Sequence, residues 1–61
     1  MVTSVRLLVD LLGDHEGAEI YIPSGTVGEA WGASEDGLFV EFALPSADVT
    51  LLVAYRDCEE I

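Results

Sequence analysis

Turn signals divide this chain into short apolar segments, and this division restricts the fold more than any other feature of the sequence. The clearest signals are Pro23-Ser24-Gly25-Thr26 and Asp36-Gly37. Proline and glycine favour tight turns because they readily adopt the backbone angles that turns require. The segments between the signals have the length of strands and are short for helices. The sequence therefore predicts an all-β chain of five short strands.

The second half of the chain carries the clearest strand pattern. Residues 38–42 alternate, so that every second side chain is apolar and predicted to face a core. Phe39 and Glu41 are predicted to face outward on the same strand. Residues 49–54 are β-branched or apolar and predict the next strand, after a turn at residues 44–48.

The segment 5–12 is almost entirely apolar and suits two structures. In a strand, alternate residues would line one face, with Arg6 and Asp10 on the other face. In a short helix, Ser4 would cap the N-terminus and Gly13 would end the helix. The strand is favoured because the segments that follow it are strands.

The remaining segments complete the predicted architecture. Residues 13–19 are polar and predict a loop, whereas residues 27–31 predict a strand interrupted by Gly28. A glycine within a strand indicates a bulge or a bend, which would let both Val27 and Ala30 face inward. Small barrels need such bends to close. The predicted fold is a small five-stranded SH3-like barrel.

Three segments resemble parts of known SH3-like barrels. Residues 22–28, Ile-Pro-Ser-Gly-Thr-Val-Gly, resemble the I-P-x-G-T-x-G start of the second strand. Residues 38–42 resemble the third strand, and residues 55–61 resemble the closing turn and last strand. The chain is similar to the DUF4926-type family of unknown function, and more distantly to the nitrile hydratase β-subunit barrel and to KOW-type modules. The resemblance covers residues 5–61 and implies a fold without assigning functional residues.

Charge excludes several classes of partner. The chain has 61 residues, enough for a single domain over 1–61, and a net charge of -10 with only Arg6 and Arg56 as basic residues. This balance opposes direct binding to nucleic acid phosphates, unlike the basic KOW modules that bind RNA, and also opposes binding to anionic membranes. No apolar run is long enough to span a bilayer, and no signal-peptide pattern begins the chain. The expected location is cytoplasmic, which the lone Cys58 also fits.

No group of residues predicts a catalytic or metal site. Residues 14–16, Asp-His-Glu, have no second histidine or cysteine cluster to complete a metal coordination sphere. Ser24 and Ser46 lie in turns without a nucleophile-elbow pattern, and a barrel this small leaves little room for a substrate pocket. Cys58 stands beside acidic residues that raise its pKa, so it is interpreted as a half-buried structural residue. We expect no enzyme activity and no cofactor.

The apolar content exceeds what so small an interior can hold. The chain is 51% hydrophobic, and a larger exposed apolar patch usually marks an interaction surface. The predicted interior residues are Val5, Leu7, Val9, Leu11, Ile20 or Ile22, Val27, Ala30, Leu38, Val40, Phe42, Leu51, Val53 and Ile61. The apolar residues without a place inside are Leu8, Leu12, Trp31, Phe39, Leu44, Leu52 and Tyr55.

Four of these residues form the predicted partner-binding set: Trp31, Phe39, Leu52 and Tyr55. They predict a non-enzymatic protein-binding or structural module whose partner is another protein or a second copy of the chain. Two alternatives remain open. One is an acidic inhibitor or nucleic acid mimic that captures a basic protein surface. The other is an accessory domain of an enzyme complex.

Overall fold

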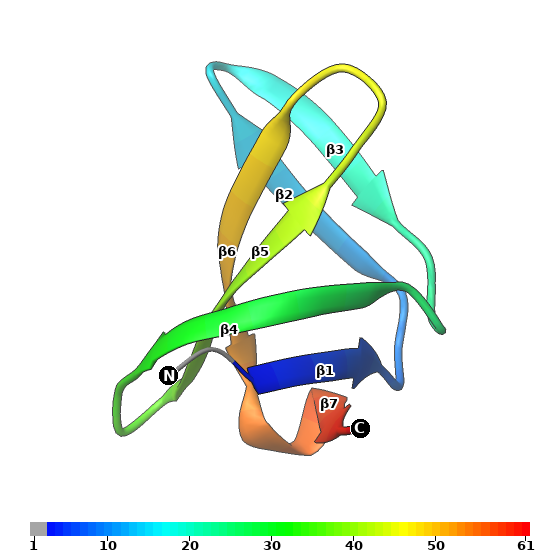
Figure 1. Ribbon diagram of the computed structural model, residues 1–61. Helices are drawn as coiled ribbons and strands as arrows, with labels where there is room; N and C mark the ends of the chain where they lie inside the picture. The colour runs from blue at the N-terminus through cyan, green and yellow to red at the C-terminus, as the bar shows by residue number, and fades with distance from the viewer. Residues whose placement is uncertain (1–2) are drawn as a thin grey trace.

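The computed structural model describes residues 3–61 and is all-β, as predicted (Figure 1). It has seven strands in place of the expected five, and every strand pairing is antiparallel. The strands are β1 (Thr3–Leu7), β2 (Leu11–His15), β3 (Ala18–Ile22), β4 (Val27–Ala33), β5 (Gly37–Ala43), β6 (Asp48–Ala54) and β7 (Cys58–Glu60), with a 3-10 turn η1 (Tyr55–Asp57) before β7. A five-stranded sheet has the order β6-β5-β4-β1-β7, and β2 and β3 form a second sheet.

The segment 5–12 is extended and not helical, but it is not one strand. It bends at residues 8–10 and divides between β1 in the large sheet and β2 in the small one. Two hydrogen bonds fix the bend: the Leu8 N–H donates to the backbone carbonyl of Asp57, and the Ser24 N–H donates to the side-chain carboxylate of Asp10. Alternation in an apolar run cannot reveal where a chain leaves one sheet for another.

The polar segment 13–19 is a hairpin and not the predicted loop. Its two strands pair from Leu11 opposite Ile22 to His15 opposite Ala18, leaving Glu16 and Gly17 as the connection. Both connecting residues have positive φ, 52° and 82°, as a type I′ turn requires. Glutamate is uncommon at the first of these positions, so the sequence lacks the usual Asn-Gly or Asp-Gly signal.

The turn predicted at Pro23-Ser24-Gly25-Thr26 is confirmed. The Thr26 N–H and hydroxyl both donate to the Pro23 carbonyl, and Gly25 has φ 90° at the position where a type II turn favours glycine. The turn is joined to β1 by bonds between Leu7 and both Gly25 and Thr26. The motif that carries the family resemblance therefore joins β3 to β4.

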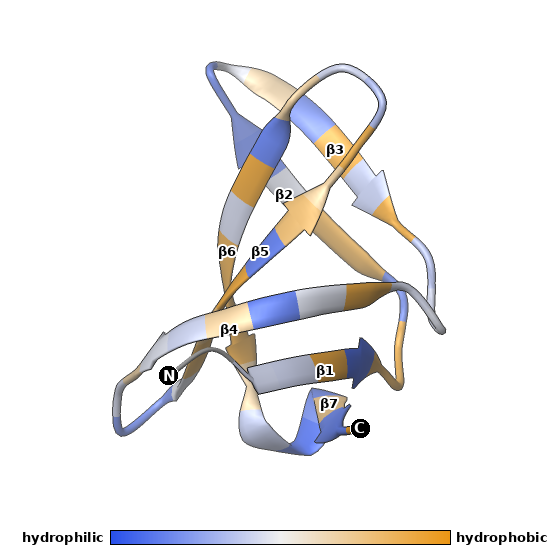
Figure 2. Ribbon diagram, in the orientation of Figure 1, coloured by the Kyte–Doolittle hydropathy of each residue, from blue (hydrophilic) through white to orange (hydrophobic). Residues whose placement is uncertain are grey.

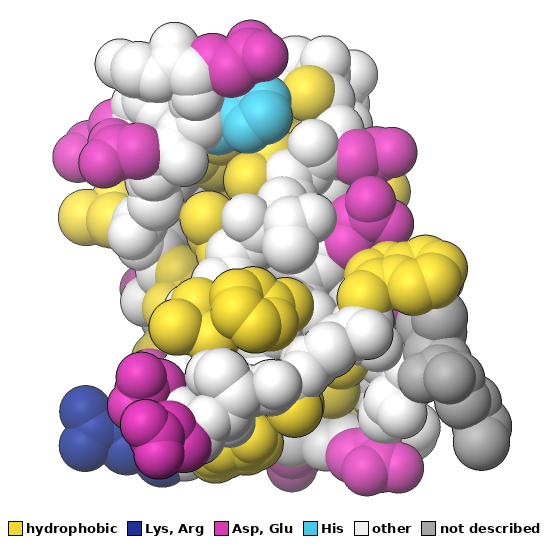
Figure 3. All heavy atoms as spheres, turned by 90° about the vertical axis from the view of Figure 1, so that its left-hand side faces the viewer, with side chains coloured by type: hydrophobic (Ala, Val, Ile, Leu, Met, Phe, Trp, Pro, Cys, Tyr) yellow, Lys and Arg dark blue, Asp and Glu magenta, His cyan; other side chains and the backbone are white. Residues whose placement is uncertain are grey.

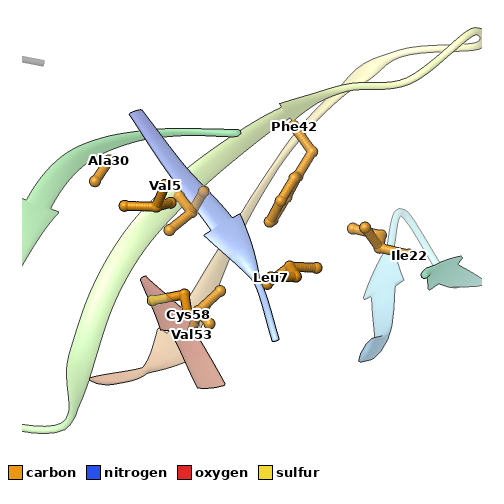
Figure 4. Close-up of a cluster of buried hydrophobic side chains, with 8 residues drawn as sticks. Val5, Leu7, Ile22, Ala30, Phe42, Val53 and Cys58 are labelled. Atoms are coloured by element: carbon orange, nitrogen blue, oxygen red, sulfur yellow. The ribbon is translucent and has the colours of Figure 1, made fainter. Parts of the chain in front are cut away.

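The core lies between the two sheets, and most of its residues are ones that the sequence predicted to face inward (Figures 2 and 4). Hydrophobic and polar residues alternate along the upper parts of β5 and β6 in Figure 2. The buried cluster comprises Val5, Leu7, Ile22, Ala30, Val40, Phe42, Val53 and Cys58, drawn in Figure 4. Leu11, Ile20, Leu38, Leu44 and Leu51 pack against it while partly exposed.

Some predicted interior residues lie outside. Val9 is exposed at the bend, and Val27 and Ile61 are also exposed. Val49 and Cys58 are buried instead, and Cys58 lies deeper than the half-buried position expected for it. Val27 faces outward because Gly28, not Val27, occupies the inward position opposite Val5.

Gly28 therefore has a different role from the predicted bend. The bulge in β4 falls between Ala30 and Gly32, where the register with β5 shifts. At Gly28, a Cβ atom would stand 2.7 Å from Val40 Cγ1 and 2.8 Å from both the Glu41 carbonyl oxygen and Phe42 Cδ1. Glycine is needed at this position because two strands and the core approach it closely.

The small sheet packs against the large one through another glycine. A Cβ atom at Gly13 would lie 3.0 Å from the methyl groups of Leu51 on β6. The hairpin β2–β3 thereby covers the inner side of β6, and Ile22 closes the core from β3. No helix among residues 3–61 is long and apolar enough to cross a lipid bilayer.

Candidate functional site

The outward side of β4, β5 and β6 brings together three of the four residues predicted to bind a partner. In β5, Val40 and Phe42 are fully buried, so Phe39 and Glu41 must point to the opposite side. The same alternation turns Asp48, Thr50 and Leu52 of β6 outward, because Val49 and Val53 are buried. We call this side the outer face, defined by Glu29, Trp31, Phe39, Glu41, Asp48, Thr50 and Leu52.

Trp31 joins the outer face through the bulge in β4. It is the extra residue between Ala30, which pairs with Val40, and Gly32, which pairs with Phe39. A bulge redirects the side chain that it carries. The Trp31 indole N–H donates to Glu41 Oε1 at 3.2 Å, while 61% of the residue remains exposed. This bond holds the indole on the same side as Glu41.

One end of the outer face is apolar, and we call Trp31, Phe39 and Leu52 the apolar end. Phe39 and Leu52 are directly opposite each other across β5 and β6, with 41% and 49% of their surface exposed. Gly32 leaves space beside the Phe39 ring, since a Cβ atom there would lie 3.6 Å from Phe39 Cδ2. Seen from the left-hand side of Figure 1, hydrophobic side chains gather at mid-height with acidic side chains above and below them (Figure 3).

The other end is acidic, and we call Glu29, Glu41 and Asp48 the acidic end. Glu29 and Glu41 are directly opposite each other on β4 and β5. Like charges in this arrangement repel and destabilise the sheet. A hollow of about 210 Å³ lies beside the three carboxylates, with the backbone of Gly28 in its wall.

Neither arginine neutralises the acidic end. Arg6 donates through Nη2 to Glu59 Oε1 at 2.6 Å, and Arg56 lies 3.7 Å from Asp57. Among residues 3–61, no basic side chain lies within 4 Å of a carboxylate of Glu29 or Glu41. The negative charge of the acidic end is therefore open to solvent.

Tyr55, the fourth predicted residue, lies in η1 and not in the three strands of the outer face. Its hydroxyl donates to the Ser34 carbonyl, which ties η1 to the turn between β4 and β5. It lines a hollow of about 470 Å³ together with Trp31, Leu38 and Cys58. This hollow is open to solvent on one side and is not enclosed within the core.

A second exposed apolar pair was not among the predicted partner-binding residues. Leu12 and Tyr21 are directly opposite each other on β2 and β3, with 70% and 58% of their surface exposed. Next along the hairpin, Asp14 is directly opposite Glu19. This pair of like charges resembles Glu29 and Glu41 in its arrangement but has no tryptophan bonded to it. Neither pair could be recognised from the sequence, because the sequence predicted a loop at residues 13–19.

The remaining chemistry-bearing residues do not converge. The described residues contain no group of three histidine, cysteine or acidic side chains that could hold a metal ion. His15 lies 4.0 Å from its neighbour Glu16 at the tip of the hairpin. Burial raises the pKa of the Cys58 thiol, and the charge of Asp57 raises it further. The sequence predicted a raised pKa for Cys58 from neighbouring charge alone, whereas burial is the larger cause.

Comparison with known proteins gives no relative on which to base a function. No protein-family model, no curated protein and no solved structure matches the chain. The functional argument therefore depends on the chain's own residues.

Proposed function

We propose that this protein is a non-enzymatic protein-binding module that contacts its partner with the outer face. The observation that carries the proposal is the apolar end: three large hydrophobic side chains from three adjacent strands, all substantially exposed. Aromatic residues, tryptophan above all, contribute disproportionately to protein interfaces. A rigid sheet holds these side chains in place, so little conformational entropy is lost when a partner binds.

We also propose that the two sheets together form an SH3-like barrel. Support comes from the sharp division of residues 5–12 between the sheets, the bulge at Trp31 and the contact of Leu51 with Gly13. These features curve a sheet and bring its ends together. Amide hydrogen exchange tests the proposal: amides of the β2–β3 hairpin are expected to be protected together with those of the large sheet, and a hairpin that exchanges independently of the large sheet would contradict a single barrel.

A partner of a different sequence suits the outer face better than a second copy. Two copies with a net charge of -10 repel each other, and the acidic end would bring carboxylates together at the contact. Sedimentation equilibrium over a range of salt concentrations separates the cases. A monomer at all salt concentrations is expected, whereas a dimer that strengthens with salt and is lost in Phe39→Ser would show self-association.

Site-specific photo-crosslinking tests the binding module in cells of the native host. A photoreactive residue replaces Leu52 on the outer face or, as a matched control, Leu12 on the β2–β3 hairpin, since both are exposed leucines in strands. We expect a defined crosslinked product from position 52 that Phe39→Ser abolishes, and none from position 12. Equal products from both positions, or none from position 52, would refute the proposal.

A further inference from the structure

We infer that the partner presents a basic segment, in which an arginine occupies the acidic end and an adjacent apolar side chain covers the apolar end. This inference rests on the proposed function and adds the chemistry of the partner. The outer face has two chemically different ends within one surface, joined by the hydrogen bond from Trp31 to Glu41. A segment that fits both ends must carry positive and apolar side chains close together.

The charge arrangement points to a cation from outside the chain. Glu29 and Glu41 face each other across adjacent strands, and Asp48 lies on the next strand. Of the chain's two arginines, Arg6 is paired with Glu59, and Arg56 extends into solvent beside Asp57. A cation placed at the acidic end would turn repulsion between like charges into attraction, because each carboxylate would gain a partner of opposite sign.

The space beside these carboxylates suits a guanidinium group. The hollow of about 210 Å³ is several times the volume of one water molecule, roughly 30 Å³ in the liquid. The three carboxylates do not come together closely enough to form a metal-binding group within residues 3–61. A planar guanidinium donates several hydrogen bonds in a fixed fork and can reach carboxylates that lie apart.

Trp31 borders the acidic end through Glu41 but does not line the hollow. Its indole N–H bonds to one oxygen of Glu41, which leaves the other oxygen of that carboxylate available. The ring itself is mostly exposed and is left for the side chain that follows the arginine in the segment. An aromatic ring packs against apolar side chains and also attracts a nearby cation, so the ring and the carboxylates favour the same kind of segment.

A labelled peptide tests this chemistry directly. The probe is a short capped peptide in which arginine and leucine alternate, measured by fluorescence anisotropy at low salt. Trp31 is the only tryptophan, so a change in protein emission reports that the peptide binds near Trp31, and the variants below locate it at the acidic end. We expect saturable binding with an emission change, weaker binding of the lysine analogue, and loss of binding when citrulline replaces arginine.

Paired variants test whether the acidic end is the site. The double variant Glu29→Gln, Glu41→Gln is expected to weaken binding about tenfold, the loss of two exposed charge contacts. Its control is Asp14→Asn, Glu19→Gln, which removes the same charge from an equivalent pair across β2 and β3. We expect the control to bind within about twofold of the unaltered protein, since long-range attraction alone is weak and screened. Thermal melts check that both variants remain folded.

Each other outcome overturns the inference. Equal weakening in both double variants would mean attraction by overall charge, and undiminished binding of the citrulline peptide would mean apolar contact alone. Absence of any binding would exclude basic peptides as partners. The crosslink from position 52 distinguishes these failures from failure of the proposed function: a crosslink that persists in Glu29→Gln, Glu41→Gln would leave a protein-binding face with a partner that is not basic.

Discussion

Gly28→Ala is expected to destabilise the protein by about 2 kcal/mol, although it adds a single methyl group. The new Cβ would approach three atoms to within 3.0 Å, and two of them belong to the fully buried side chains Val40 and Phe42. The third is the carbonyl oxygen of Glu41 in the adjacent strand. Neither the core nor the sheet can move aside without losing contacts elsewhere.

The magnitude follows from two opposing terms. Overpacking a rigid core typically costs 1–3 kcal/mol, and three simultaneous close contacts place Gly28→Ala near the upper end, about 3 kcal/mol. Alanine also restricts the unfolded chain, which offsets roughly 0.4–1 kcal/mol. For a domain of this size, a net loss of about 2 kcal/mol lowers Tm by roughly 8–16 °C.

Gly32→Ala is the matched control, since both glycines lie in β4 without positive φ. The nearest heavy atom to its Cβ would be Phe39 Cδ2 at 3.6 Å, an ordinary contact. Its free energy of unfolding should stay the same or rise by up to about 1 kcal/mol. Urea unfolding followed by circular dichroism measures both variants. Equal stabilities for the two variants would refute the argument from close approach.

Four further predictions concern other parts of the fold. Gly37→Ala should be more damaging than Gly28→Ala, because its Cβ would meet backbone atoms of Val53, and thermal denaturation should show a lower Tm. Tyr55→Phe should cost roughly 0.5–1.5 kcal/mol in urea unfolding through loss of the bond to the Ser34 carbonyl, and an unchanged stability would show that this bond contributes nothing. Because burial and Asp57 raise the pKa of Cys58, iodoacetamide should modify the folded protein much more slowly than the urea-unfolded chain at pH 8. Because the pKa of Cys58 in the folded protein is above its ordinary value of 9.0, the thiol stabilises the folded state below pH 9.0. This contribution should disappear as the pH rises through the folded pKa. A free energy of unfolding that does not change with pH in this range would contradict the prediction.

The candidate face was partly visible in the sequence. Alternation in residues 38–42 placed Phe39 outward, and the structure confirms this exposure. Leu52 could be recognised only as an apolar residue without a place inside, and its pairing with Phe39 follows from the register of β5 and β6. The acidic end was not predicted, because Glu29, Glu41 and Asp48 are far apart in the chain and meet only when three strands pair.

The sequence by itself determined the all-β class, the turn at Pro23-Ser24-Gly25-Thr26 and the inward positions of β5, because turn chemistry and side-chain alternation act between near neighbours. Only the tertiary structure decided that residues 5–12 divide between two sheets, that residues 13–19 pair as a hairpin, and that Gly28 is needed for close packing. The hairpin depends on a tight turn at Glu16-Gly17 that lacks the usual turn residues, whereas the division between sheets and the close packing at Gly28 depend on residues from distant strands approaching one another. The same holds for the outer face, whose two chemical ends arise from the order and register of β4, β5 and β6.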